Sequence, residues 1–168
     1  EVKLDASGQI DLGHLEALLQ DPAYQGRLRI GSFSAASNVT GIRSDVRAVA
    51  TLLHRYDAMA CFDYAACAPY VEIDMNPAPL NEGDDPAIDA IFVSPHKFLG
   101  GPGSSGVLVF NERIYNRELP PSVSAGGTVD YVGPEDQDFI SHIEEREKAG
   151  TPGVLQTLKA GLVFQIKD

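Results

Sequence analysis

Residues 88–110, IDAIFVSPHKFLGGPGSSGVLVF, indicate how this chain is organised. An apolar run from Ala90 to Val93 is followed by Ser94-Pro95-His96-Lys97, a glycine-rich stretch and a second apolar run from Val107 to Phe110. Short apolar runs bounded by glycine, proline and serine are typical of buried strands. The pattern predicts two strands, with Lys97 just beyond the carboxyl end of the first, where α/β sheets bind their ligands.

Lys97 has two interpretations. A lysine among flexible backbone and small side chains suits covalent chemistry on a carbonyl, because a neutral amine can form a Schiff base. An ordinary surface lysine in a glycine-rich loop has the same spacing. The spacing alone favours the surface lysine.

Length, net charge and cysteine content limit the classes of protein to which this chain can belong. The 168 residues are enough for one domain with a sizeable core. The net charge of -11, from 13 basic and 24 acidic side chains, disfavours a surface for nucleic acid or anionic membrane. No apolar stretch approaches the roughly 18 residues of a membrane span, and the start has no signal-peptide pattern. Cys61 and Cys67 are expected to be reduced thiols of a cytoplasmic protein, with a disulfide as the alternative.

Helical and strand patterns alternate along the chain, which predicts crossover units and an α/β fold with a mainly parallel sheet flanked by helices. Loops rich in glycine, proline or acid are expected at 76–85 and 120–133. Helices are predicted for 12–19, 44–56 (with Ser44 as N-cap), 136–148 and 153–167, and strands for 2–4, 27–33 and 59–62.

The segment SPHKFLGGPG, residues 94–103, resembles the cofactor-lysine segment of the class V aminotransferase family. These are pyridoxal-phosphate enzymes that include cysteine desulfurases and selenocysteine lyases. The similarity extends from about Ser37 to about Pro152, and its motifs occur in the family's order. The resemblance implies the large, cofactor-binding domain of a fold-type I enzyme. Since family members also have a leading segment and a C-terminal small domain, residues 1–168 are expected to be the central part of a longer chain.

The resemblance implies catalytic roles for Lys97 and Asp63. Lys97 would hold pyridoxal 5'-phosphate as an aldimine and then act as general base and acid at the α-carbon of an amino-acid substrate. Asp63, in FDYAACAPY, matches the acid of the family's D-x-A-Q motif, which faces the ring nitrogen of the cofactor. Without the motif, Asp63 would be interpreted as a helix cap or a solvated loop carboxylate.

Three more residues match cofactor contacts of the family. Asn38, in SNVTG, corresponds to the asparagine that reaches the phenolic oxygen of the cofactor or the substrate carboxylate. A turn or capping role is the alternative for Asn38. Ser94 and His96 would donate hydrogen bonds to the phosphate, and His96 is assigned on the resemblance alone.

Two motifs further along the chain imply a dimer and a substrate contact. Gly126-Gly127-Thr128 resembles the turn with which one protomer contacts the phosphate in its neighbour's site, so Gly127 and Thr128 are assigned to the cofactor. A plain surface turn is the alternative. Arg146, in EREKAGTP, corresponds to an arginine near the substrate in the family, and a helical salt bridge to a neighbouring glutamate is the alternative.

The chain departs from the family pattern at two positions. Ala66 stands where a glutamine usually contacts the cofactor, and Tyr70 stands where a histidine is frequent. The implied function is that of a cysteine desulfurase or selenocysteine lyase, although the fragment is expected to be inactive alone. An aminotransferase, an amino-acid epimerase or a catalytically silent interaction module are the alternatives.

The desulfurase nucleophile is expected beyond residue 168, because neither Cys61 nor Cys67 matches it. The histidines have no metal-ligand spacing, so no metal is expected.

Overall fold

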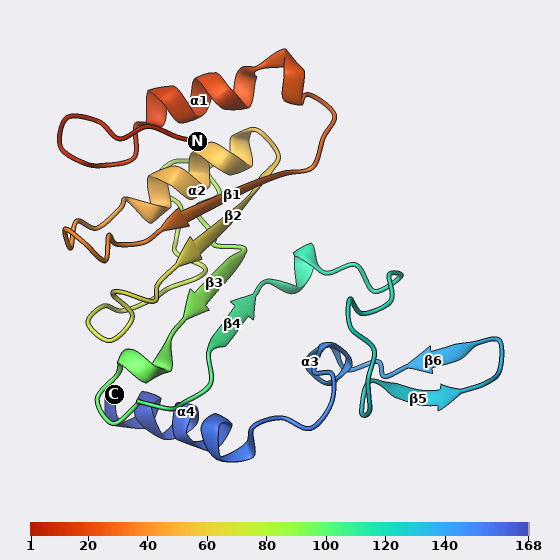
Figure 1. Cartoon of the computed structure of the whole chain (residues 1–168). Coiled ribbons are helices and arrows are strands. Elements are labelled where there is room, and N and C mark those ends of the chain that lie inside the picture. The colour runs from red at the N-terminus through yellow and green to blue at the C-terminus, as the bar shows by residue number, and fades with distance from the viewer. Residues whose placement is uncertain (168) are drawn as a thin grey trace.

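A four-stranded sheet with strand order β1-β2-β3-β4 forms the centre of the fold (Figure 1). The computed structural model describes residues 1–167. β1, β2 and β3 are parallel, and β4 is antiparallel to β3. The predicted α/β fold with a mainly parallel sheet is confirmed. The strands of this sheet are β1 (Arg29–Ser34), β2 (Ala58–Asp63), β3 (Ala90–Val93) and β4 (Val107–Phe110).

The helices close to β1 and β2 bury the apolar faces that their spacing predicts. α2 buries Val49, Leu52 and Leu53 and packs on β2, and α1 packs on α2. These side chains recur every three or four residues, as one face of a helix requires. The helices are α1 (Leu12–Gln20), α2 (Val46–Arg55), α3 (Ile143–Glu147) and α4 (Val154–Lys167), with short 3₁₀ turns η1 (Pro22–Tyr24), η2 (Pro95–Lys97) and η3 (Glu112–Ile114).

The N-cap of α2 differs from the prediction. Asp45, and not Ser44, caps the helix, because its carboxylate accepts a hydrogen bond from the Ala48 amide at 3.0 Å. The Ser44 hydroxyl instead donates to the Ser34 carbonyl oxygen at 2.7 Å. This bond ties the start of α2 to the end of β1.

The prediction of one helix over 136–148 was wrong. Its first part is strand β6 (Gln137–Phe139), which forms an antiparallel hairpin with β5 (Val129–Val132). The Gly133 amide donates to the Asp136 carbonyl oxygen at 2.8 Å and closes the hairpin. Only α3 is helical there, and Figure 1 shows it beside the hairpin, apart from the four-stranded sheet.

The strand expected at 2–4 is also absent from the structure. Only an isolated bridge between Leu4 and Ile10 forms there. A single bridge does not satisfy the backbone of a strand, so this segment stays a loop.

Both cysteines are buried and carry free thiols, as predicted. Burial raises the pKa of each thiol above its ordinary value. Within residues 1–167, none of the helices has the length and the apolar character needed to cross a bilayer.

Candidate active site

The carboxyl ends of the three parallel strands meet at one edge of the sheet. The strand register pairs Asp63 of β2 with Ser34 of β1 and with Phe92 of β3. The Ala35 amide donates to the Asp63 carbonyl oxygen, and the Tyr64 amide donates to the Phe92 carbonyl oxygen, both at 2.9 Å. The segments that leave β1, β2 and β3 therefore start side by side, as ligand sites of parallel sheets require.

Asp63 is the last residue of β2, and its side chain is exposed. Its Oδ1 atom accepts a hydrogen bond from the Ala65 amide at 2.7 Å. Within residues 1–167, the Oδ2 atom of Asp63 makes no hydrogen bond and no ion pair. One carboxylate oxygen can therefore face a protonated nitrogen of a ligand.

Ser94, His96 and Lys97 are placed together by η2, which directly follows β3. Pro95 begins this turn, and the Lys97 amide donates to the Ser94 carbonyl oxygen at 3.0 Å. His96 and Lys97 are exposed, while Ser94 is half-buried. The Lys97 amine, the His96 imidazole and the Ser94 hydroxyl therefore lie just beyond the carboxyl end of β3, the strand that pairs with β2.

The glycine-rich loop after Lys97 folds back onto η2. A Cβ atom on Gly101 would lie 1.9 Å from the carbonyl oxygen of Pro95, so a side chain does not fit there. Gly100 has a φ of +76°, in the left-handed region that favours glycine. The loop after Lys97 therefore requires glycine at positions 100 and 101.

Gly101→Ala is expected to destabilise the protein by about 2 kcal/mol or more, because backbone atoms have to move to admit the methyl group. The control is Gly161→Ala in α4, where a Cβ meets open space. That change should stabilise the helix by up to about 1 kcal/mol. Urea unfolding of both variants measures the difference, and equal midpoints would show that the loop adapts to the side chain.

Asn38 lies in the turn that follows β1. The turn is held by Ser37, whose Oγ atom accepts hydrogen bonds from the Val39 and Thr40 amides at 3.2 and 3.1 Å. The Asn38 side chain is exposed and makes no hydrogen bond within the described part of the chain. Its amide is therefore not used for capping. A cleft of about 660 Å³ along β1 reaches Asn38, but neither Asp63 nor Lys97 lines it.

Gly127 and Thr128 lie at the start of the β5–β6 hairpin, which Figure 1 shows well apart from η2. Gly127 has a φ of +87°, which explains the glycine. Thr128 is fully buried, and its hydroxyl donates to the Ala125 carbonyl oxygen at 2.8 Å. Within one chain, the structure does not bring this turn to Lys97.

Arg146 also lies away from Lys97, on α3 (Figure 1). Only 9% of its surface is exposed, its guanidinium lies 5.3 Å above the centre of the Phe139 ring, and it donates to the Leu119 carbonyl oxygen. Across residues 1–167 it forms no ion pair, so the alternative of a salt bridge to a neighbouring glutamate was wrong. Its Nε atom is buried without a hydrogen-bond partner.

The two departures from the family pattern lie in the turn after Asp63. The methyl group of Ala66 offers no hydrogen bond to a ligand. Tyr70 points into solvent with 82% of its surface exposed.

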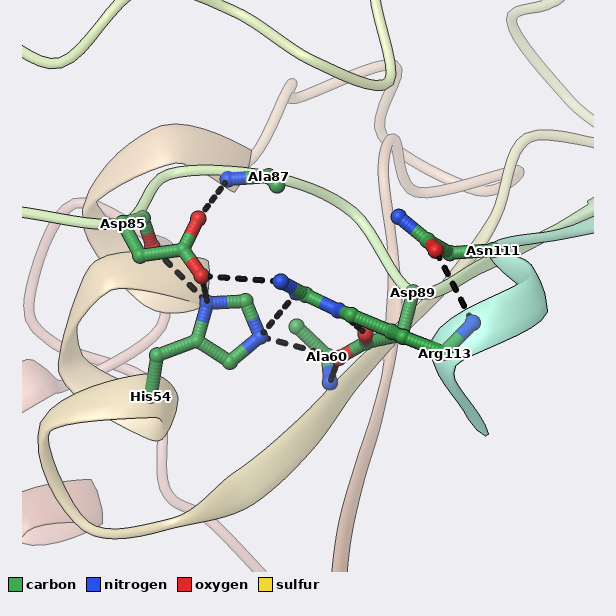
Figure 2. Close-up of polar contacts among 7 residues, drawn as sticks. All are labelled: His54, Ala60, Asp85, Ala87, Asp89, Asn111 and Arg113. Atoms are coloured by element: carbon green, nitrogen blue, oxygen red, sulfur yellow. Dashed lines mark hydrogen bonds and ion pairs between the residues drawn. The ribbon is translucent and has the colours of Figure 1, made fainter. Parts of the chain in front are cut away.

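A second polar cluster lies around the amino ends of β2 and β3, opposite the edge that carries Lys97. Its centre is Asp89, which is 2% exposed and directly precedes β3. Figure 2 shows the Asp89 carboxylate between three groups: the Ala60 amide at 2.7 Å, His54 Nε2 at 2.9 Å and Arg113 Nε at 2.7 Å. One carboxylate thereby joins β2, α2 and η3.

Asp85 completes the cluster from the loop before β3. Its carboxylate accepts a hydrogen bond from Arg113 Nη1 at 3.0 Å, and its carbonyl oxygen lies 2.8 Å from His54 Nδ1 (Figure 2). No sequence motif marks these residues. An acidic residue directly before an apolar strand is the one local signal for Asp89. Nowhere in residues 1–167 do three or more His, Cys, Asp or Glu side chains gather so as to hold a metal ion.

Asp89→Asn is expected to lower the free energy of unfolding at neutral pH by about 2 kcal/mol, because charged hydrogen bonds are lost in a buried site. Burial acts to raise the pKa of Asp89, but hydrogen bonds from Ala60, His54 and Arg113 outweigh it and hold the pKa below its ordinary value. The charged form therefore stabilises the fold above about pH 4, and this contribution is lost as the pH falls through the lowered pKa.

Denaturant unfolding between neutral and acidic pH measures this contribution. The variant should lose less stability on acidification than the wild type. Asp130→Asn, at an exposed position of β5, is the control and should retain the wild-type profile. Parallel profiles for wild type and Asp89→Asn would contradict the assignment.

Comparison with known proteins identifies the family. Residues 1–167 match the aminotransferase class-V family. A probable cysteine desulfurase of Chlamydia muridarum is 35% identical over 162 residues, which cover 96% of this chain and 36% of that protein. A probable cysteine desulfurase 2 of Mycobacterium leprae is 27% identical over 90% of this chain and 32% of its own length.

Solved structures show the same fold. The apo cysteine desulfurase of Thermococcus onnurineus NA1 matches with a TM-score of 0.78 at 21% identity, over 99% of this chain and 38% of that one. The Escherichia coli cysteine desulfurase CsdA matches with a TM-score of 0.74 at 24% identity, over 97% of this chain and 37% of that one.

The sheet, with its lysine-bearing turn at the carboxyl edge, defines an α/β domain of the fold-type I class. The chain belongs to the class V aminotransferase family. It spans little more than a third of the length of the Chlamydia relative.

Proposed function

We propose that this chain is the cofactor-binding part of a pyridoxal-phosphate enzyme that acts on an amino acid as a cysteine desulfurase or selenocysteine lyase. The observation that carries the proposal is the pairing of β2 with β3, which puts Asp63 beside the segment that holds Lys97. Membership of the class V aminotransferase family and relatives named as cysteine desulfurases support it.

The chemistry of the side chains fits this cofactor. Pyridoxal phosphate would supply an aldehyde, which condenses with an amine with loss of one water, and a ring that withdraws electrons. Lys97 Nζ is the amine on this edge, and it would move a proton at the substrate's α-carbon once it is free again. The Asp63 carboxylate would keep a proton on the ring nitrogen, since a negative charge favours the protonated form.

The remaining polar side chains would bind and orient. Ser94 and His96 would donate to the phosphate, and Asn38 would contact the ring oxygen or the substrate carboxylate. Exposure of Asn38 and His96 is compatible with these roles. The turn with Gly127 and Thr128 would contact the phosphate in the site of a homodimer partner, although the Thr128 hydroxyl is buried against the Ala125 carbonyl oxygen in this chain. Arg146 would contact the substrate.

Sulfur transfer would require a thiol other than the two in this chain. Cys61 and Cys67 are buried, and burial raises the pKa of both thiols, which makes them poor nucleophiles. A selenocysteine lyase or a desulfurase with its nucleophile elsewhere in the protein is compatible with this arrangement.

Ala66 favours a second candidate, a catalytically silent module that serves interaction. Without the amide of a glutamine, this position would lose one cofactor contact. Aminotransferase and epimerase activities would use the same Lys97 and Asp63, so the reaction product distinguishes them.

The complete protein, incubated with pyridoxal phosphate, tests the proposal. A visible absorbance band that sodium borohydride abolishes, together with release of alanine from cysteine or selenocysteine, is the expected result. Racemisation or a keto-acid product would instead indicate the epimerase or the aminotransferase. If the protein shows neither the absorbance band nor turnover with any amino acid, the catalytically silent module is the remaining candidate.

A further inference from the structure

We propose that α4 is a positioning element for Lys97 and that Phe164 is the residue through which it acts. This inference rests on the proposed function, because it concerns the reaction of Lys97 with an aldehyde. Lys97 itself is exposed, and its Nζ atom has no hydrogen bond or ion pair within residues 1–167. Its position therefore depends on how the backbone on either side of it is held.

The residue after Lys97 is the first anchor. Phe98 is 4% exposed, and its ring meets the ring of Phe164 edge to face, with centres 5.0 Å apart and an interplanar angle of 60°. Aromatic pairs in this geometry stabilise beyond the burial of their surface. Since Lys97 and Phe98 share a peptide bond, fixing the Phe98 ring also restrains the Cα atom of Lys97.

The loop beyond Phe98 is bound to the same helix at two more points. The Ser105 amide donates to the Gln156 carbonyl oxygen at 3.2 Å, and Lys159 Nζ donates to the carbonyl oxygen of Pro102. The order along the loop is the reverse of the order along α4, so residues 98–105 run antiparallel to the helix. Figure 1 shows α4 below η2, with the loop along it.

This attachment matters because of how a covalent bond to a bound aldehyde forms. The amine nitrogen adds to the aldehyde carbon, the C=N bond forms, and one water leaves. An amine held near the aldehyde reacts at a high effective concentration, and this advantage falls when the amine moves. A looser loop should leave more of the bound cofactor unlinked.

Phe164→Leu in the complete protein tests the inference. After loading with pyridoxal phosphate and reduction with borohydride, peptide mass spectrometry gives the fraction of bound cofactor that is linked to Lys97. We expect this fraction to fall about threefold in Phe164→Leu, because leucine cannot reproduce the ring contact. Phe164→Tyr, which keeps the ring, should restore it.

Two further variants separate positioning from stability. Leu15→Ala removes a side chain that is 4% exposed on α1. It should lower the thermal midpoint and leave the linked fraction unchanged. Lys159→Met removes the contact with Pro102 at a half-buried position without opening the core, and should lower the fraction even if Phe164→Leu does not fold.

The outcomes are distinct. A wild-type linked fraction in folded Phe164→Leu or in Lys159→Met, or a loss of equal size in Leu15→Ala, would overturn the positioning role. Absence of any label on Lys97 in the wild type would overturn the proposed function, and this inference with it.

Discussion

Lys97→Ala in the complete protein is expected to abolish the borohydride-trapped cofactor and to lower amino-acid turnover by about 1,000-fold or more, since the alanine can neither link the aldehyde nor move the α-proton. In the wild type, the reduced cofactor should be recovered on the peptide that contains Lys97. Peptide mass spectrometry and a turnover assay with cysteine measure the two effects.

Other exposed lysines provide the control. Lys148→Ala removes an amine that lies outside the parallel edge of the sheet and should retain wild-type labelling and turnover. Label on Lys3 or Lys148 in the wild type, with Lys97 unmodified, would refute the assignment of the η2 lysine.

Asp63→Asn is expected to keep the covalent link to Lys97 and to lose about 100-fold in turnover, because an amide lacks the charge that favours a protonated ring nitrogen, and one pKa unit is worth about 1.4 kcal/mol. The side-chain oxygen of the new amide would still accept the hydrogen bond that the Ala65 amide now donates to Asp63, so the turn should be retained. Borohydride trapping and turnover are measured on the same preparation.

Asp74→Asn is a matched control for this change. Asp74 is also exposed, and its Oδ1 atom accepts a hydrogen bond from the amide two residues later, that of Asn76, at 2.9 Å. The same substitution in the same kind of turn should leave turnover unchanged. Wild-type rates in Asp63→Asn would show that Asp63 is structural.

Local signals were sufficient to predict the parallel edge of the sheet. Glycine, proline and serine bound the apolar runs that form β3 and β4. The apolar run that forms β2 ends at Asp63. Strand pairing then brings Asp63 to the segment of Lys97. Hydrophobic periodicity likewise predicted α1 and α2, and Pro152 close to the start of the last helix indicated α4.

Features that depend on exposed or distant residues could not be predicted. The β5–β6 hairpin is largely exposed, so its sequence lacks the apolar alternation of a half-buried strand, and its charged residues suggest a helix instead. The contacts of Asp89 join residues that are far apart in sequence and have no shared motif. Arg146 packs on Phe139, a contact that requires the hairpin to be known.

The connection between β2 and β3 affects the order in which the protein folds. Residues 64–89 join these adjacent parallel strands without a helix, whereas α2 joins β1 to β2. Closing a long flexible connection costs chain entropy before any contact compensates for it. The β1-α2-β2 unit should therefore form early, and β3 should dock late, when Asp89 reaches Ala60. Contacts made that late determine mainly how fast the native state opens, so the Asp89 cluster is expected to slow unfolding more than it speeds folding.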